Sequence, residues 1–112
     1  MAQADIVLIT GANTGIGYQI VRALASSENP HEIIVAGRSL DKVQAAIDSA
    51  KAEFSSTSSK LHPLQLDLES DESINAAFEK VQTQFGRLDV LINNGGELPH
   101  LALETIRAYV YP

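Results

Sequence analysis

The chain has 112 residues with a formal net charge of −6 at pH 7, and 45% of its residues are hydrophobic. This length allows one compact domain, and the scattered Lys and Arg residues disfavour a nucleic-acid-binding surface. No apolar run approaches the ~20 residues that cross a bilayer, and the lack of cysteine excludes disulfides and thiolate metal sites. A cytoplasmic protein without a membrane or nucleic-acid partner is therefore expected.

Strand-like and helix-like segments alternate along the chain. Short apolar runs predict strands at 5–10, 33–36, 61–66 and 88–93, and helical periodicity predicts helices at about 16–26, 40–54 and 70–85. Short, nearly continuous apolar strands are typical of a parallel sheet that is covered on both faces. The alternation predicts an α/β fold, a doubly wound parallel sheet with right-handed connections that is truncated after about four strands.

Each predicted helix carries its apolar residues at the three-and-four spacing of one buried face. Ser39 and Ser70 stand where the N-caps of the second and third helices belong, and Gly86 stands where a C-terminal cap belongs. The first helix is expected to pack through Ile16, Ile20, Ala23 and Leu24.

A glycine-rich segment follows the first predicted strand and opens the first predicted helix. Residues 10–17 read TGANTGIG. Gly11, Gly15 and Gly17 suit a tight turn, a close backbone approach to a pyrophosphate, and close packing of the helix on the strand. The free amides and the positive end of the helix would face the phosphates. In this strand–turn–helix context the segment predicts a dinucleotide-binding loop, and the alternative is a turn that merely requires glycines.

The spacing of these glycines resembles the TGxxxGxG motif of the short-chain dehydrogenase/reductase family. Two further family motifs occur in the expected order: Asp67-Leu68 ends the third strand, and residues 93–96 read NNGG where the family has NNAG. The resemblance covers residues 5 to about 96 and implies a Rossmann-like fold that binds a nicotinamide dinucleotide. Gly95 replaces the family's Ala, which should loosen the backbone at the cofactor's edge without abolishing binding.

The resemblance also implies individual roles. The glycine-rich loop would line the pyrophosphate, residues 67–68 would hold the adenine, and residues 94–95 would border the ribose. Thr10 and Asn93 are expected instead to tie the first and fourth strands together. The complete expected cofactor-binding set is Gly11, Asn13, Thr14, Gly15, Ile16, Gly17, Arg38, Ser39, Asp67, Leu68, Asn94 and Gly95.

The residues after the second predicted strand bear on the choice of cofactor. NAD sites of this kind place a carboxylate there, on the ribose 2′-hydroxyl, whereas this sequence has Arg38 and Ser39. Arg38 can pair with a 2′-phosphate, and Ser39 can add a hydroxyl or amide contact. NADP(H) is therefore expected in preference to NAD(H). The alternative is that Arg38 stacks on the adenine or lies in solvent.

The family's catalytic groups, a Ser and a Tyr-x-x-x-Lys pair that serve proton transfer, have no match in this sequence. None of the four lysines has a Tyr four residues before it, and the three histidines show no metal-ligand spacing. We expect an NADP(H)-dependent oxidoreductase of this family, represented here by a truncated cofactor-binding fragment that is inactive alone. The alternatives are a non-catalytic NADP(H)-binding module and a non-functional fragment.

The last residues do not clearly continue the family's pattern. The chain is therefore divided into an incomplete NAD(P)-binding domain at residues 1–96 and an atypical tail at residues 97–112. Our hypothesis is that the reading frame was cut near Gly95. Because the fourth predicted strand would then form an apolar sheet edge, self-association or aggregation of the chain is expected.

Overall fold

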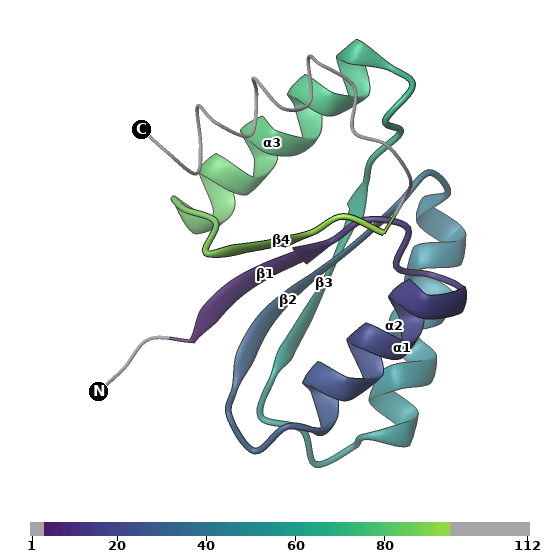
Figure 1. The fold of residues 1–112 in the computed structure, drawn as a ribbon, viewed down its shortest axis with the longest axis vertical. Coiled ribbons are helices and arrows are strands. Elements are labelled where there is room, and N and C mark those ends of the chain that lie inside the picture. The colour runs from purple at the N-terminus through teal and green to yellow at the C-terminus, as the bar shows by residue number, and fades with distance from the viewer. Residues whose placement is uncertain (1–3, 95–112) are drawn as a thin grey trace.

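The computed structural model describes residues 4–94. Strands and helices alternate in the order and type that the sequence predicts, with boundaries that differ by a few residues (Figure 1). The elements are β1 (Asp5–Ile9), α1 (Gly15–Ser26), β2 (His31–Gly37), α2 (Leu40–Glu53), β3 (Lys60–Gln65), α3 (Asp71–Phe85) and β4 (Val90–Ile92).

The strands form one parallel sheet with the order β3-β2-β1-β4. β1 lies inside the sheet, where Leu8 is paired with Ile34 of β2 and with Leu91 of β4. After β3 the chain crosses back to the other side of β1, so the carboxyl ends of β1 and β4 adjoin. This change of direction is the topological switch point of a doubly wound sheet, and it confirms the predicted Rossmann-like fold.

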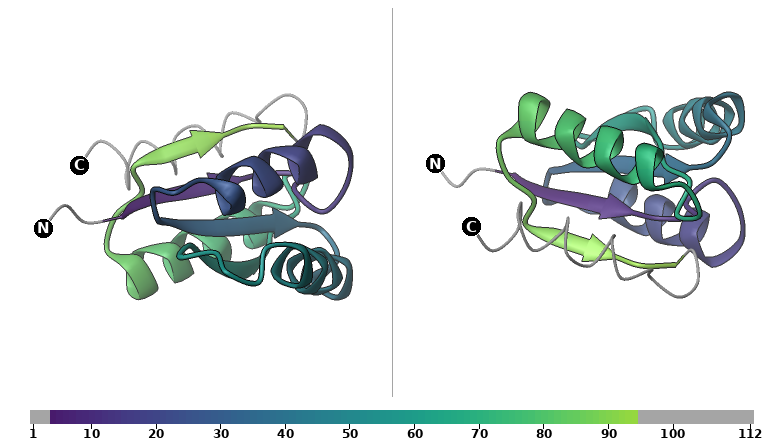
Figure 2. Two further views of the ribbon diagram at one scale, coloured as in Figure 1. Left: turned by 90° about the horizontal axis from the view of Figure 1, so that it is seen from below. Right: turned by 90° about the horizontal axis from the view of Figure 1, so that it is seen from above.

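Helices cover both faces of the sheet, with α3 on one face and α1 and α2 on the other (Figure 2). Successive strand side chains point to opposite faces, so Leu8 packs in the core under α3 while Ile9 packs in the core under α1 and α2. Phe78 of α3 and Ile47 of α2 are the largest buried helix side chains in these two cores.

The predicted helix caps are confirmed at three positions. The Ser39 hydroxyl accepts a hydrogen bond from the Lys42 amide at 3.4 Å, and the Ser70 hydroxyl accepts one from the Ser73 amide at 3.2 Å. Gly86 ends α3 in the left-handed conformation at φ 76°, which a side chain rarely adopts. No helix within residues 4–94 has the length and apolarity needed to span a membrane.

The predicted buried face of α1 is wrong by about one residue. Ile16 is 72% exposed, and Ala23 is exposed as well. The helix instead buries Gly17, Val21 and Ala25, with Ile20 and Leu24 partly buried at the flanks of this stripe. Gly17 lies against the backbone of the preceding loop, so tertiary contact at the start of the helix decides which stripe faces the sheet.

A polar clamp joins the segment before β4 to the start of β1. The Ile6 amide donates to the Asp89 carboxylate at 2.8 Å, and Arg87 donates to the same carboxylate and to the Ala4 carbonyl. The hydrogen bond from Ile6 lowers the pKa of Asp89 from its usual value, and Arg87 lowers it further. The clamp lies at the amino ends of these strands, away from the carboxyl ends where the chain turns into its helices.

Candidate functional site

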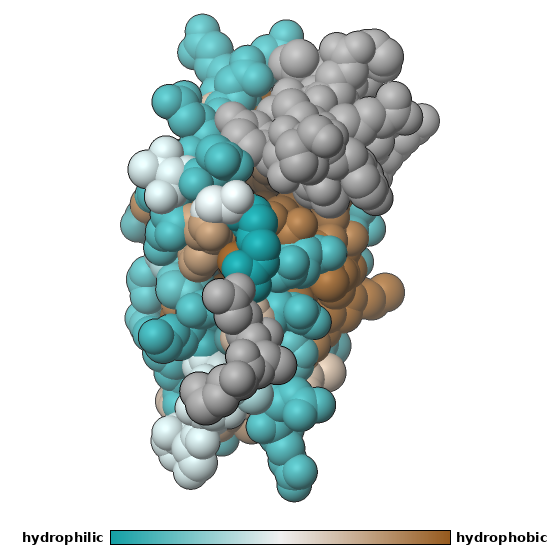
Figure 3. Space-filling view, turned by 90° about the vertical axis from the view of Figure 1, so that its left-hand side faces the viewer, coloured by the Kyte–Doolittle hydropathy of each residue, from teal (hydrophilic) through white to brown (hydrophobic). Residues whose placement is uncertain are grey.

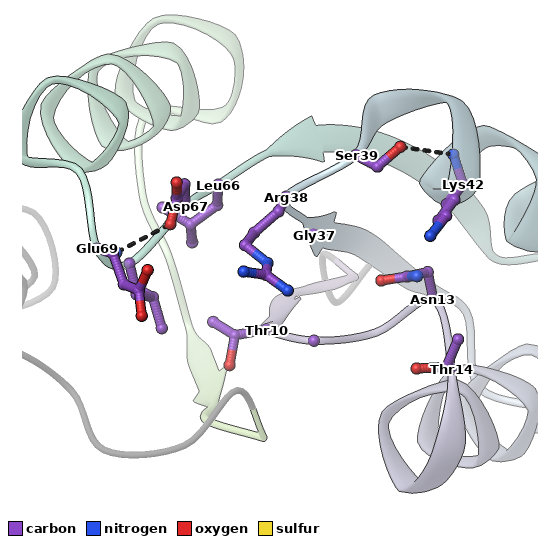
Figure 4. A pocket seen from close by; sticks show the side chains of 12 residues that line it. Thr10, Asn13, Thr14, Gly37, Arg38, Ser39, Lys42, Leu66, Asp67 and Glu69 are labelled. Carbon is purple, nitrogen blue, oxygen red and sulfur yellow. Dashed lines mark hydrogen bonds between the residues drawn. The ribbon is translucent and has the colours of Figure 1, made fainter.

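A pocket of about 550 Å³ opens at the carboxyl ends of β1, β2 and β3 (Figure 4). This is the edge at which open α/β sheets bind ligands, and the volume lies in the range of small-molecule sites. The residues that line the pocket are Thr10, Gly11, Asn13, Thr14, Gly37, Arg38, Ser39, Lys42, Leu66, Asp67, Leu68 and Glu69.

The loop between β1 and α1 forms one wall of the pocket. Gly11 and Gly15 have φ values of 57° and 59°, a region in which an L side chain is strained. The Ala12 amide donates to the Ala36 carbonyl at 3.0 Å, which ties the loop to the end of β2. The two glycines therefore allow a turn that the neighbouring strand holds in place.

Gly17 permits the start of α1 to lie directly against this loop. A Cβ atom on Gly17 would stand 2.3 Å from the Gly11 carbonyl oxygen and 2.7 Å from the Asn94 carboxamide nitrogen. That nitrogen donates to the Gly11 carbonyl at 3.2 Å. A hydrogen bond between residues that are 83 positions apart in the sequence thus fixes the position of the loop.

The ends of β1 and β4 are joined by a second set of bonds. The Thr10 hydroxyl donates to the Asn93 side chain at 3.0 Å and accepts from the Asn94 amide at 2.9 Å. These bonds tie the two strands together in the way expected of Thr10 and Asn93. The Asn94 side chain bonds to the Gly11 carbonyl and is not among the residues that line the pocket.

The amino end of α1 carries no side chain that would compete with a bound anion. Thr14 is the N-cap residue and is extended, but its side chain makes no capping hydrogen bond, and the first turn contains no acidic residue. The first amides of a helix carry a partial positive charge. A phosphate group placed at Thr14 would therefore meet free donors and a favourable dipole.

The end of β2 supplies a basic corner. Gly37 ends the strand, Arg38 is exposed in the pocket, and Ser39 is the N-cap residue of α2. The Arg38 carbonyl accepts a hydrogen bond from the Gln65 side chain at 3.3 Å. This bond fixes the Arg38 backbone and leaves the guanidinium to the pocket, where Figure 4 shows it between the β3 end and the glycine-rich loop.

The end of β3 supplies the acidic corner. The Asp67 carboxylate accepts from the Glu69 amide at 3.0 Å, and the Asp67 amide donates to the Ser73 hydroxyl at 2.8 Å. The Leu66 amide donates to the Gly37 carbonyl at 2.9 Å, so this end is also tied to β2. One Asp67 carboxylate oxygen is thus engaged in the turn, and the residue lines the pocket.

The structure brings together seven of the twelve residues expected from the sequence. Gly15, Ile16, Gly17 and Asn94 lie outside the lining of the pocket, and Gly95 lies outside the described residues. The lining residues from the expected set are Gly11, Asn13, Thr14, Arg38, Ser39, Asp67 and Leu68.

Sequence reasoning missed five lining residues: Thr10, Gly37, Lys42, Leu66 and Glu69. The N-cap at Ser39 was a usable signal for Lys42, because it places that residue in the first turn of α2 beside the strand end. Within residues 4–94, no three His, Cys, Asp or Glu side chains gather as they would to hold a metal ion.

Comparison with known proteins places this geometry in a family. The short-chain dehydrogenase/reductase eupG of a Phoma species is 41% identical over 92 residues, which cover 81% of this chain and 33% of that protein. The structure of menthone neomenthol reductase from Mentha piperita matches with a TM-score of 0.77 and 33% identity, covering 86% of this chain and 33% of its own. The N-domain of a bacterial malonyl-CoA reductase, solved with NADP, matches with a TM-score of 0.74 and 32% identity over 83% of this chain and 17% of its own.

The chain spans about a third of the length of the curated relatives that it matches. The model of the short chain dehydrogenase family matches residues 5–109, which include every element of the sheet and every wall of the pocket. The chain therefore belongs to the short-chain dehydrogenase family.

Proposed function

We propose that the chain binds NADP(H) in the pocket at the strand ends and supplies the cofactor-binding part of an oxidoreductase that transfers hydride between a carbonyl and an alcohol. The observation that carries the proposal is that three different segments line the same pocket. The three walls that they form are the glycine-rich loop, the basic corner at Arg38 and the acidic corner at Asp67. Each wall matches the chemistry of one part of the dinucleotide.

The pyrophosphate would lie against the glycine-rich loop and the amino end of α1. Gly11 has no side chain to keep a phosphate from the backbone, and Thr14 leaves the first helical amides without a side-chain cap. Asn13 and Thr14 add polar side chains at the same wall (Figure 4). A helix start of this form stabilises an anion through its amides and its dipole.

The adenine would lie at the end of β3. The turn that engages one Asp67 oxygen holds the carboxylate in a fixed orientation, in which it can accept a hydrogen bond from the adenine amino group. Leu68 is half-buried against the core under α3 and offers an apolar edge to the ring. These positions agree with the roles that the family resemblance implies for Asp67 and Leu68.

The 2′-phosphate would lie at the basic corner. No carboxylate follows β2 directly, and Arg38 projects into the pocket. An arginine fork can give two hydrogen bonds to a phosphate, and the Ser39 hydroxyl can add one more. The malonyl-CoA reductase N-domain, which is 32% identical to this chain, was solved with NADP and supports this preference.

The 112 residues alone are expected to bind the cofactor without turnover. The family's chemistry uses a Tyr-x-x-x-Lys pair and a Ser, and no Tyr in this sequence precedes a Lys at that spacing. The second candidate function is a non-catalytic NADP(H)-binding module, which the same pocket would serve. Oxidation of NADPH in the presence of carbonyl compounds separates the two, because only the oxidoreductase turns over.

The test is the ratio of the dissociation constants for NADH and NADPH, measured by titration calorimetry. We expect NADPH to bind at least ~10-fold more tightly, a difference of ~1.4 kcal/mol. Arg38→Ala should bring the ratio close to one by weakening NADPH alone, and Lys80→Ala at an exposed position of α3 is the control. Equal affinities that Arg38→Ala leaves unchanged would rule out the NADP preference, and absence of binding to either cofactor would rule out the proposed function.

We also propose that the 112-residue chain self-associates. Hydrophobic surface is exposed on one face of the molecule (Figure 3). Within residues 4–94, β4 is an edge strand of the sheet, and its Val90 is 39% exposed. An apolar strand edge is a template for pairing with another chain. Sedimentation should show oligomers at micromolar concentration, whereas a monomer with one cooperative thermal transition would contradict this proposal. The cytoplasmic location stays a prediction, which cell fractionation tests.

A further inference from the structure

The sequence contains one asparagine that is followed by a glycine. This residue is Asn94, and Gly95 after it replaces the alanine of the family motif. An asparagine carboxamide can be attacked by the backbone nitrogen of the next residue. Because glycine has no Cβ atom, its nitrogen is free of the hindrance that a side chain causes. The sequence therefore puts a reactive pair directly after β4.

Asn93 and Asn94 are adjacent, but the structure distinguishes them. The nitrogen that would attack the Asn93 carboxamide is the Asn94 amide, and that amide donates to the Thr10 hydroxyl at 2.9 Å. The same hydroxyl donates to the Asn93 side-chain oxygen at 3.0 Å, so Thr10 holds both reacting groups of Asn93. The Asn94 carboxamide is held by a longer bond, 3.2 Å from its nitrogen to the Gly11 carbonyl oxygen. Asn94 is therefore the more reactive of the two.

The three remaining asparagines lie in contexts that oppose the same reaction. Asn13 precedes a threonine, whose branched side chain hinders its own nitrogen, and Asn29 precedes a proline, which has no backbone N–H group. Asn75 lies within α3, where backbone amides are committed to carbonyls of the preceding turn. These three residues serve as internal references for reaction at Asn94.

The Asn94 carboxamide nitrogen also lies close to the start of α1. A Cβ atom on Gly17, the third residue of that helix, would stand 2.7 Å from this nitrogen. A carboxylate at residue 94 would remove the donor to the Gly11 carbonyl and set two acceptors against each other. It would also put a negative charge beside the helix start that offers its amides to the pyrophosphate, and like charges repel.

We propose that Asn94 is a site of spontaneous deamidation, and that the acid formed there loosens the glycine-rich loop and weakens the binding of either dinucleotide. The Gly95 backbone nitrogen forms a bond to the Asn94 side-chain carbonyl carbon. The bond from that carbon to the carboxamide nitrogen breaks, and ammonia leaves with the proton of the Gly95 amide. Water then opens the succinimide to aspartate or isoaspartate, without oxidation or reduction. The effect on binding rests on the proposed function, whereas the modification does not.

The modification is tested by ageing the purified 112-residue chain in mildly alkaline buffer and following its tryptic peptides by tandem mass spectrometry. One tryptic peptide, residues 88–107, carries Asn93 and Asn94, and the other asparagines lie on three separate peptides. Gly95→Ala is the variant that hinders the attack. Gly96→Ala is its matched control, because it adds the same methyl group and keeps the reactive pair.

Acid should accumulate at Asn94 ahead of every other asparagine, both in the parent chain and in Gly96→Ala. Gly95→Ala should form it far more slowly. The absence of acid at Asn94, its earlier appearance at Asn93, or an equal rate in Gly95→Ala would overturn the assignment of the site.

The consequence for binding is tested by titration calorimetry of NADPH and NADH with the aged chain and with Asn94→Asp. Asn94→Asp should weaken both cofactors by ~10-fold. The aged chain should lose binding in proportion to the acid found at residue 94. Asn29→Asp, at an exposed position between α1 and β2, is the control for a new negative charge and should change neither affinity.

Circular dichroism should show the same helices in the aged chain and in both variants, because the effect is local to the loop. Loss of the helices, loss of one cofactor alone, or parental affinity in Asn94→Asp would overturn the effect on the loop. If the fresh chain binds neither cofactor, the proposed function fails, and acid that forms first at Asn94 still supports the deamidation site.

Discussion

The two ends of the pocket are built in different ways. At the glycine-rich loop the backbone itself forms the wall, and its position is fixed by Gly17, by the Asn94 carboxamide and by a hydrogen bond to β2. At the basic corner the wall consists of exposed side chains, Arg38 and Lys42, whose charged ends make no ion pair within the described residues.

Because of this difference, we expect the glycine-rich loop to determine affinity for dinucleotides in general and the basic corner to determine which dinucleotide is preferred. A wall made of backbone amides accepts a phosphate from any dinucleotide, because every such cofactor carries a pyrophosphate. A wall made of side chains recognises the group that only one cofactor carries, and it can change by substitution without disturbing the sheet. Changes at the loop should therefore affect both cofactors equally, and changes at the basic corner should affect one of them.

The largest effect is expected for Gly17→Ala. Alanine in a helix is normally favoured over glycine by ~1 kcal/mol, but here the added Cβ would stand 2.3 Å from the Gly11 carbonyl oxygen. Moving the loop away should cost about 3 kcal/mol, so the clash outweighs the helix preference. We expect a lower melting temperature and NADPH and NADH affinities that fall together.

Ser49→Ala at an exposed position of α2 is the control for Gly17→Ala, because it adds an alanine to a helix without a close contact. A Gly17→Ala chain that is as stable as the parent and binds both cofactors equally well would show that the close approach does not define the loop.

A smaller effect is expected for Asn94→Ala. This change removes the hydrogen bond to the Gly11 carbonyl, which is worth about 1 kcal/mol. Calorimetry should show NADPH and NADH binding weakened by the same factor, about fivefold, because the side chain holds the loop and does not touch the 2′-position. Asn75→Ala, at an exposed position of α3, serves as the control. Selective loss of one cofactor would place Asn94 in the pocket instead.

The smallest effect is expected for Asp89→Asn, which weakens the clamp at the opposite end of the sheet. The bond from Ile6 lowers the pKa of Asp89 in the folded chain, so its stabilisation is present above the unfolded pKa of ~3.9 and is lost as the pH falls through the lower folded value. Because the carboxylate is partly exposed, we expect a loss of ~1 kcal/mol at most.

Denaturant unfolding at pH 7 and at pH 2–3 checks this sign for Asp89→Asn. The difference in the free energy of unfolding between Asp89→Asn and the parent chain should shrink at the lower pH. The ratio of the NADPH and NADH affinities at pH 7 should stay unchanged. A difference that grows on acidification would refute the assignment of the clamp.

Local features of the fold could be predicted from residue patterns, whereas the only long-range contact expected was the tie of Thr10 to Asn93, which came from the family resemblance. Ser39 and Ser70 cap their helices because a cap depends on residues three positions away. Apolar periodicity predicted that Ile16 is buried, but the residue is exposed. The backbone contact at Gly17 selects the neighbouring stripe of the helix, and periodicity does not reveal that contact. The role of Asn94 depends on a partner 83 residues away.

The pocket shows the same limit. Motif matching identified residues on all three walls, including Arg38 and Asp67, but Lys42 and Glu69 belong to no motif. They line the pocket because α2 and α3 begin beside the strand ends, a consequence of the sheet order.

The most direct test of the account follows the amide resonances of the ¹⁵N-labelled chain during titration with NADPH and then with NADH. NADPH should shift resonances of both walls, residues 11–17 and residues 37–42, whereas NADH should shift the first set and leave the second nearly unchanged. Shifts confined to the distant pocket at residues 55–58, or identical shifts of residues 37–42 with both cofactors, would contradict the division of the pocket into a shared phosphate wall and a wall selective for the 2′-phosphate.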